Sequence, residues 1–199
     1  MNIIYREGRK EDSLRLAELI NIASEGVVEY LFHDLIPDLT PVQIIAHNLE
    51  SDKYPRSYKN TIVAESNGKI VGMALSIPSR FHKISEEMKN FFPEERLAHL
   101  KHFFAARVEN SLLLDTLCVE EEFRGKGIGG GLISLTENKA KENSHDALSL
   151  IVFADNTAAQ RLYKRYGFEI VENVKLESHQ LIPHDGGCLL MRYNITLNE

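Results

Sequence analysis

Apolar residues recur at helical spacing near the start of the chain. Leu16, Ile20 and Ala23 lie three or four residues apart, which predicts an apolar stripe along one face of a helix. Asp12 and Ser13 stand just before this stripe, where a short polar side chain often caps the first turn. We therefore expect the first helix to begin at this point.

Two β-branched runs farther along the chain predict a hairpin. They cover residues 61–65 and 70–75, and an Asn-Gly pair lies between them. Asn-Gly tolerates the positive φ angles of a tight turn, so the two runs are expected to pair as antiparallel strands. Residues 24–60 are interrupted by prolines, and the pattern there indicates only a short helix over 42–49.

Strands and helices alternate in the second half of the chain. Apolar runs of strand length occupy 111–119 and 147–153. Between them, apolar residues return to helical spacing, which predicts a helix that starts within a glycine-rich stretch and runs to about Asn143.

The last elements complete a mixed architecture. Asp155 or Asn156 can cap a helix that Gly167 would end in the left-handed conformation. Strands over 168–171 and 188–193 follow. Because the alternation is regular only late in the chain, we expect a mixed sheet of α/β or α+β type flanked by helices.

Composition is that of an ordinary globular protein. The 199 residues are 43% hydrophobic and 26% charged, so a core can form without disulfides. We expect one domain over 1–199, with a mainly helical insertion at about 78–110. No apolar run reaches the ~20 residues of a membrane helix and no secretory signal opens the chain, so a cytoplasmic location is expected. With only Cys118 and Cys188 present, no thiolate metal site is expected.

A glycine-rich stretch after the 111–119 strand is the most informative segment. It reads Arg124-Gly125-Lys126-Gly127-Ile128-Gly129 and leads into the predicted helix. Glycines let the chain turn and leave main-chain N–H groups accessible, and the first N–H groups of a helix attract anions. The stretch therefore predicts a phosphate site, to which Arg124 and Lys126 add positive charge.

One interpretation of this stretch is a dinucleotide site. Gly125, Gly127 and Gly130 match G-x-G-x-x-G, which would make the protein an NAD-dependent oxidoreductase. In that fingerprint the glycines follow their strand directly, whereas five residues separate Val119 from Gly125 here. Asp146, the acidic residue about 20 positions on, precedes its strand rather than ending it, which also counts against this interpretation.

A second interpretation joins two motifs. Arg124, Gly127 and Gly129 form Arg-x-x-Gly-x-Gly, and residues 156–168 follow the pattern N-x-x-A-x-x-x-Y-x-x-x-G-F. In these segments the sequence resembles the GNAT superfamily of N-acetyltransferases, whose central strand and acetyl-CoA pyrophosphate loop look like residues 117–129. The resemblance covers residues 112 to about 170.

The resemblance implies a GNAT-type fold and an acetyl-CoA site. In this family two neighbouring parallel strands splay apart and the pantetheine arm lies in the gap, and here the strands would be those at 112–119 and 147–153. A main-chain N–H group of the first strand would also bind the thioester oxygen. The implied cofactor-binding residues are Leu117, Cys118, Val119, Arg124, Gly125, Lys126, Gly127, Ile128, Gly129 and Asn156.

The resemblance also implies a catalytic pair. Tyr163 matches the family tyrosine that lies near the cofactor sulfur as general acid, with simple core packing as the alternative. Asp115 is our candidate base, because it lies on the same strand face as Leu117 and a carboxylate in an apolar strand needs a partner or a function. The alternative for Asp115 is a bond to nearby backbone or a cation. Glu25, Glu29 or a water chain could also serve as the base.

Together these features predict an N-acetyltransferase that moves acetyl from acetyl-CoA to a primary amine of a small molecule or a protein, without a metal. The net charge of −6 at pH 7 argues against nucleic acid as the main partner and mildly favours a cationic acceptor. The alternatives are the oxidoreductase and a non-catalytic acyl-CoA-binding module. A membrane is not an expected partner, and a homodimer is one option for the oligomeric state.

Overall fold

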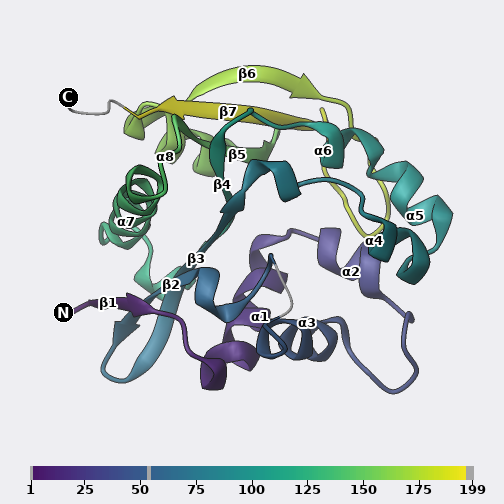
Figure 1. The fold of residues 1–199 in the computed structure, drawn as a ribbon, viewed down its shortest axis with the longest axis horizontal. Coiled ribbons are helices and arrows are strands. Elements are labelled where there is room, and N and C mark those ends of the chain that lie inside the picture. Colours follow the sequence, from purple (N-terminus) through teal and green to yellow (C-terminus); the bar gives the residue numbers. More distant parts are fainter. Residues whose placement is uncertain (1, 53–54, 196–199) are drawn as a thin grey trace. The chain divides into compact units, whose positions relative to one another are not determined.

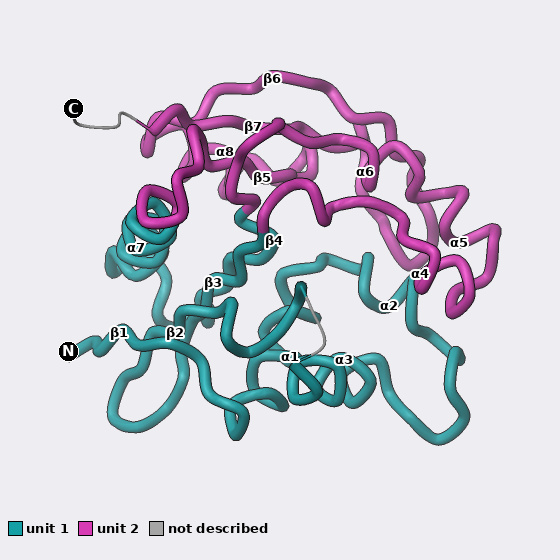
Figure 2. Tube along the Cα trace, viewed as in Figure 1, with its two compact units in different colours: residues 1–77, 114–139 teal, residues 78–113, 140–199 magenta. Residues whose placement is uncertain are grey.

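The structure is a computed structural model that describes residues 2–52 and 55–195. The chain forms two compact units, coloured separately in Figure 2. Unit 1 consists of Met1–Ile77 and Leu114–Lys139, and unit 2 consists of Pro78–Leu113 and Ala140–Glu199. Two elements, β4 (Ser111–Val119) and α7 (Ile128–Glu142), pass from one unit to the other.

Unit 1 contains an antiparallel arrangement of strands with three helices after the first strand (Figure 1). The hydrogen-bonded order is β1-β2-β3-β4, and the turn between β2 and β3 is the predicted Asn-Gly hairpin. Asn67 and Gly68 both have positive φ angles there, 51° and 75°. The strands are β1 (Ile4–Glu7), β2 (Thr61–Ser66) and β3 (Lys69–Pro78), and the helices are α1 (Ser13–Ala23), α2 (Val27–Phe32) and α3 (Pro41–Glu50).

The core of unit 1 lies between these helices and one face of its strands. Leu16, Leu19 and Leu49 of the helices pack in one cluster with Val63 and Met73 of the strands, all almost completely buried. This burial follows from the apolar stripe of α1 and from alternate residues of β2 and β3, whose side chains point to the same face of the sheet.

Helix α7 covers the opposite face of the unit 1 strands. Tyr5 of β1 pairs with Ala64, whose side chain points away from the face that Val63 uses. Gly131 of α7 lies so close to the Tyr5 hydroxyl that a Cβ at this position would overlap it. Gly131 is therefore a packing glycine that brings the helix onto the sheet.

Unit 2 continues the strand order as β4-β5-β7-β6. β5 pairs with β7 over its full length, and its side chains on both faces are mostly buried. Strands β5 (Ala147–Phe153), β6 (Glu169–Val174) and β7 (Cys188–Asn194) are accompanied by helices α4 (Glu86–Phe91), α5 (Glu94–His99), α6 (Lys101–Ala105) and α8 (Thr157–Tyr166). Short 3-10 turns lie at Lys10–Asp12, Tyr58–Asn60, Ser79–Phe81 and Glu121–Phe123.

The parallel ladder between β4 and β5 is short. It joins Ser111 to Ala147 and ends where Leu113 pairs with Ser149, although β4 continues to Val119 and β5 to Phe153. In the described chain, the β4 and β5 main chains are therefore paired only at their beginnings. The mixed sheet with one parallel pair and flanking helices confirms the expected fold class.

One local prediction is wrong in detail. Asp12 does not cap α1: it has helical dihedral angles, and its carboxylate accepts hydrogen bonds from the Arg9 main-chain N–H at 2.8 Å and from Arg6 at 2.7 Å. A 3-10 turn before Ser13 takes the Asp12 carboxylate away from the first α-helical turn. The second predicted cap is confirmed at Asn156, and Gly167 ends α8 with φ 101°.

Candidate functional site

The glycine loop has the open geometry that an anion site requires. Gly125 and Gly127 adopt φ angles of 73° and 82°, in the left-handed region that favours glycine. A Cβ built on either residue, or on Gly130, would meet no atom within 4 Å. The loop therefore needs glycine for its backbone conformation and leaves space above its main chain.

Helix α7 begins inside this loop, as predicted. The Gly131 N–H donates to the Gly127 carbonyl at 3.0 Å and closes a turn at the start of the helix. The N–H groups before Gly131 belong to the first turn of a 15-residue helix, where they have no carbonyl one turn earlier to bond. These donors and the positive end of the helix dipole together can bind a phosphate.

Glu120 fixes the start of the loop to the rest of unit 1. Its N–H donates to the Val71 carbonyl of β3 at 2.8 Å. Its carboxylate forms ion pairs with Arg15 of α1 and with Lys69, the latter at 3.3 Å. Arg15 also donates to the Ile70 carbonyl at 3.3 Å. The loop thus departs from a point held by both α1 and β3.

The two cationic residues of the loop lie close to it. The Arg124 Nε donates to the Val119 carbonyl at 3.0 Å, so this side chain folds back across the turn that follows β4. The Lys126 Nζ lies 5.0 Å from the centre of the Phe123 ring, within cation–π range. Both contacts are with residues that precede the glycines, Val119 and Phe123.

The end of β4 presents main-chain groups away from β3. The N–H and C=O of one strand residue point to the same edge, and successive residues alternate between edges. Because the Glu120 N–H bonds β3, the main-chain groups of Leu117 and Val119 point to the other edge. That is the edge on which the ladder with β5 ends at Leu113.

Cys118 can contribute only through its main chain. Its side chain is 4% exposed and packs in the unit 1 core. Burial raises the pKa of the Cys118 thiol to about 11, so the thiol is protonated at neutral pH and is a poor nucleophile.

Asp115 lies on the predicted face of β4, and it is part of an ion pair. Asp115, Leu117 and Val119 are partly exposed, while Thr116 and Cys118 between them are buried. The Asp115 carboxylate accepts two hydrogen bonds from Arg56, at 3.1 Å from Nε and 2.7 Å from Nη2. The side chain of Asp115 is 13% exposed and that of Arg56 is 38% exposed, so the pair is open on the arginine side. This arrangement corresponds to the bond to a cation that we gave as the alternative for Asp115.

Unit 2 carries the second motif on one helix. The Asn156 side chain accepts a hydrogen bond from the Ala159 N–H at 3.0 Å and so caps α8. Tyr163, two turns along the helix, is 9% exposed, and its ring packs edge-on against Phe168 with the centroids 5.8 Å apart. Both residues therefore have a structural role, and that role does not conflict with the proposed binding and acid roles.

The other candidate bases lie in unit 1 around the start of α2. Glu25 has a φ angle of 47° and Gly26 one of 106°, which produces the sharp turn between α1 and α2. Glu29, on α2 itself, forms a hydrogen bond with the His33 ring at 3.0 Å. Within residues 2–52 and 55–195, no group of three or more His, Cys, Asp or Glu side chains is arranged to hold a metal ion.

Two arginines that pair with Glu120 and Asp115 carry no recognisable sequence signal. Arg15 and Arg56 pair with Glu120 and Asp115 across 105 and 59 positions of sequence. Neither belongs to either motif, and separations of this length cannot be inferred from local spacing.

Comparison with known protein families identifies the family of this chain. The model of the acetyltransferase (GNAT) family matches residues 28–168, which is well over half of the sequence. The chain therefore belongs to the GNAT acetyltransferase family. This membership agrees with the two motifs and disfavours the dinucleotide interpretation of the glycine loop.

Curated relatives match over shorter segments. A mycothiol acetyltransferase of Corynebacterium aurimucosum is 40% identical over 52 residues, which is 26% of this chain and 17% of that protein. An uncharacterized N-acetyltransferase of Methanocaldococcus jannaschii is 42% identical over 57 residues, which is 29% of this chain and 25% of that protein. The matched segments thus span a quarter or less of these relatives.

Solved structures share the fold. An N-acetyltransferase from Staphylococcus aureus Mu50 superposes with a TM-score of 0.72 at 19% identity, covering 96% of this chain and 100% of that one. A putative acetyltransferase from Salmonella typhimurium, solved with acetyl-CoA, gives a TM-score of 0.58 at 16% identity, covering 100% of this chain and 97% of that one.

Among the described residues, no helix is both long and apolar enough to cross a membrane.

Proposed function

We propose that this protein transfers the acetyl group of acetyl-CoA to a primary amine by direct attack in a ternary complex. The observation that carries the proposal is the glycine loop of 125–127, whose positive φ angles and open Cβ directions precede the first turn of α7. Membership of the GNAT family supports acetyl transfer as the chemistry.

The proposed binding roles follow from the local geometry of each unit. The pyrophosphate of acetyl-CoA binds the main-chain N–H groups from Gly125 to Gly130, with Arg124 and Lys126 adding charge. The pantetheine amides bond the main-chain groups of Leu117 and Val119 on the β4 edge opposite β3. The Asn156 side chain, which already caps α8, donates from its amide nitrogen to the same arm.

The proposed reaction forms one C–N bond and breaks one C–S bond. The neutral amine attacks the thioester carbonyl carbon, and a main-chain N–H of β4 stabilises the resulting oxyanion. Collapse of this intermediate expels the thiolate of CoA, which takes a proton from the Tyr163 hydroxyl. The proton lost by the amine goes to a base, so the products are the N-acetylated acceptor and CoA.

Asp115 is the proposed base, and its ion pair with Arg56 limits how it can act. A guanidinium beside a carboxylate stabilises the ionised form, which makes the carboxylate a weaker proton acceptor than an unpaired one. Acceptor binding must therefore loosen the pair before Asp115 can take the proton from the amine. Until then, the pair holds the carboxylate at a fixed position on β4.

Turnover with a panel of amines tests the proposal. Release of CoA thiol from acetyl-CoA would be followed with polyamines, amino acids, aminoglycosides and peptides that carry a free N-terminal or lysine amine. We expect at least one acceptor to give stoichiometric CoA and a product heavier by one acetyl group. Binding of acetyl-CoA without turnover on any acceptor would instead favour an acyl-CoA-binding module.

A further inference from the structure

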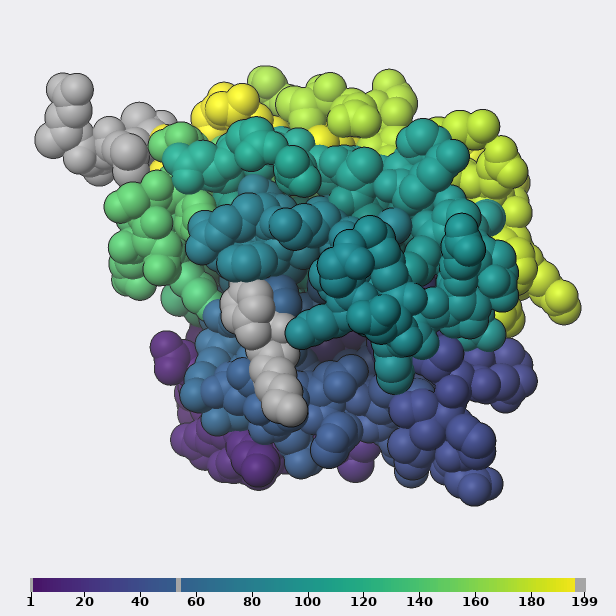
Figure 3. All heavy atoms as spheres, turned by 45° about the vertical axis from the view of Figure 1, so that its right-hand side comes forward, coloured from purple at the N-terminus to yellow at the C-terminus, as the bar shows by residue number. Residues whose placement is uncertain are grey.

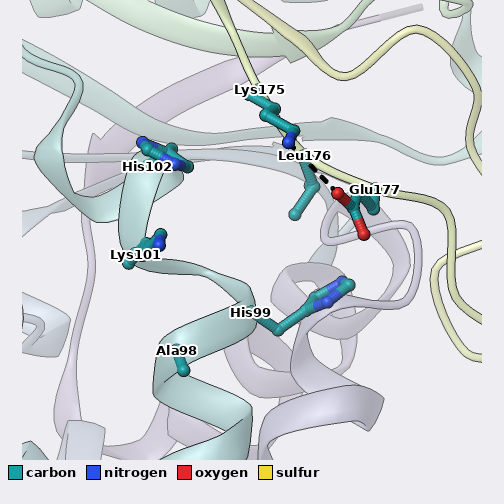
Figure 4. Close-up of a pocket in the computed structure, with 7 residues that line it drawn as sticks. All are labelled: Ala98, His99, Lys101, His102, Lys175, Leu176 and Glu177. Carbon is teal, nitrogen blue, oxygen red and sulfur yellow. Dashed lines mark ion pairs between the residues drawn. The ribbon is translucent and has the colours of Figure 1, made fainter.

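Unit 2 contains a small pocket that lies outside both GNAT motifs. It is formed where the α5–α6 segment of the insertion meets the chain that follows β6, and its volume is about 180 Å³ (Figure 4). Atoms of the insertion are also exposed in the space-filling view, where they are teal (Figure 3). The lining residues are Ala98, His99, Lys101, His102, Lys175, Leu176 and Glu177.

The pocket is rich in groups that can donate hydrogen bonds to an anion. Lys101 and Lys175 contribute two ammonium groups, and His99 and His102 contribute two imidazoles. Glu177 is the one carboxylate in the lining. This concentration of basic groups contrasts with a chain whose net charge is −6.

The existing partners of these side chains determine which donors are left to bind a ligand. Lys175 forms an exposed ion pair with Glu177 at 3.2 Å, drawn as a dashed line in Figure 4. Within the described parts of the chain, the side chains of Lys101 and His102 have no hydrogen bond or ion pair. The His99 ring packs edge-on against His179, with the centroids 5.8 Å apart. The carboxylate thus offsets Lys175, and Lys101 and His102 provide the uncompensated donors.

We propose that this pocket binds a compact oxyanion, a phosphate or carboxylate group of a ligand. A volume of about 180 Å³ accommodates such a group with a few waters but is below the ~300–1,000 Å³ of pockets that enclose drug-sized molecules. Lysine acts as a point charge toward phosphate, and a protonated imidazole donates through either ring nitrogen. None of these residues belongs to the glycine loop, so this is a second anion site that does not rest on the proposed acetyl transfer.

The test is a titration followed by the NMR signals of histidine rings. The chain has 8 histidines, and the His99→Gln and His102→Gln variants assign the two signals that report on the pocket. Sulfate, inorganic phosphate and citrate are added separately to the protein at one fixed pH. Sulfate tests for binding of an oxyanion in general, and the phosphate and citrate arms distinguish the two ligand sources.

We expect saturable shifts of these two signals, with a Kd on the order of 1 mM. Lys101→Gln should weaken sulfate binding about tenfold, which corresponds to about 1.4 kcal/mol. Glu177→Gln should strengthen it, because it removes the carboxylate that competes for Lys175. Two charge changes of opposite sign in one pocket thus have opposite predicted effects.

The α4 ion pair between Lys89 and Glu86 supplies matched controls. It joins the same residue types at 2.6 Å and lies outside the pocket, so Lys89→Gln and Glu86→Gln should leave sulfate binding unchanged. The proposal is overturned if the His99 and His102 signals do not move in a saturable way with any of the three anions. It is also overturned if Lys101→Gln and Lys89→Gln have the same effect.

Discussion

The glycine loop and the basic pocket are both suited to anions, but they are built from different parts of the polypeptide. The loop uses main-chain N–H groups from consecutive residues, made accessible by glycines at positive φ. The pocket uses side chains of Lys101, His102 and Lys175, which are brought together by two segments more than 70 residues apart. One site is local in sequence, and the other exists only in the folded unit.

This difference decides how each site responds to change. Main-chain donors carry no titratable group and are removed only by altering the backbone or blocking the space above it. Side-chain donors can be removed one at a time by substitution. Substitutions should therefore act on the loop through its conformation and its anchors, and on the pocket through charge.

The largest effect is expected on kcat, from a substitution at Tyr163 that leaves the binding of acetyl-CoA unchanged. Tyr163→Phe removes the proposed acid and keeps the ring that packs on Phe168, so kcat should fall about 100-fold while the affinity for acetyl-CoA stays the same. Steady-state kinetics with an active amine, together with calorimetric binding of acetyl-CoA, measure both quantities. Tyr166→Phe on the same helix is the control. Equal losses in the two variants would remove Tyr163 from the mechanism.

A smaller effect, on stability, is expected at Asp12 of unit 1. Asp12 is 8% exposed, and its carboxylate accepts hydrogen bonds from Arg6 and from the Arg9 N–H. Asp12→Asn should lower the free energy of unfolding at pH 7 by about 2 kcal/mol, because it weakens charge-assisted hydrogen bonds in a partly buried site. Urea unfolding measures this difference, and Glu11→Gln, in the same 3-10 turn, is the matched control.

The same variant carries a pH prediction. Burial alone raises the pKa of Asp12, but the bonds from Arg6 and Arg9 outweigh it and hold this pKa below its ordinary value. A lowered carboxyl pKa stabilises the fold above the ordinary value near 4, and the contribution disappears as pH falls through the folded-state pKa. The gap between wild type and Asp12→Asn should therefore shrink on acidification below about pH 4, and a constant gap would contradict the assignment.

The smallest effect is expected at the ion pair between Arg15 and Glu120, which anchors the start of the glycine loop. Arg15→Met removes one of the two cationic partners of Glu120 and leaves the carboxylate at the start of the loop with the more exposed Lys69. The affinity for acetyl-CoA should fall about fivefold, or about 1 kcal/mol, because the loop loses one of its supports and gains negative charge beside the phosphates. Arg107→Met, which breaks an exposed pair with Glu109, controls for the loss of a positive charge. If both variants bind acetyl-CoA like wild type, the anchor does not position the loop.

The sequence predicts well those features whose causes are local. The Asn-Gly hairpin, the start of α7 within the glycines and the Asn156 cap each depend on a few neighbouring residues, and all are present. The α8 terminus at Gly167 is of the same kind. Helix α2 was not anticipated, because it has only six residues in a region divided by prolines.

The rest of the site depends on contacts that spacing along the chain does not encode. The pairs Arg56–Asp115 and Arg15–Glu120 join residues 59 and 105 positions apart, and neither arginine stands in a motif. Asp12 shows the same limit at short range. We expected its side chain to cap α1, but its carboxylate accepts a hydrogen bond from Arg6 of β1 instead. The proposed roles of Tyr163 and Asp115 stay predictions until turnover is measured.

One measurement tests the central claim most directly: thermal unfolding with and without acetyl-CoA for wild type, Gly127→Glu and Gly68→Glu. Both glycines have positive φ and open space around a Cβ, so the two substitutions impose similar backbone strain, but only Gly127 lies in the proposed pyrophosphate loop. At a hundred times its Kd, acetyl-CoA should stabilise wild type and Gly68→Glu by about 2.7 kcal/mol, or roughly 5–11 °C. Gly127→Glu should show no shift, and a shift equal to that of Gly68→Glu would contradict the assignment of the glycine loop.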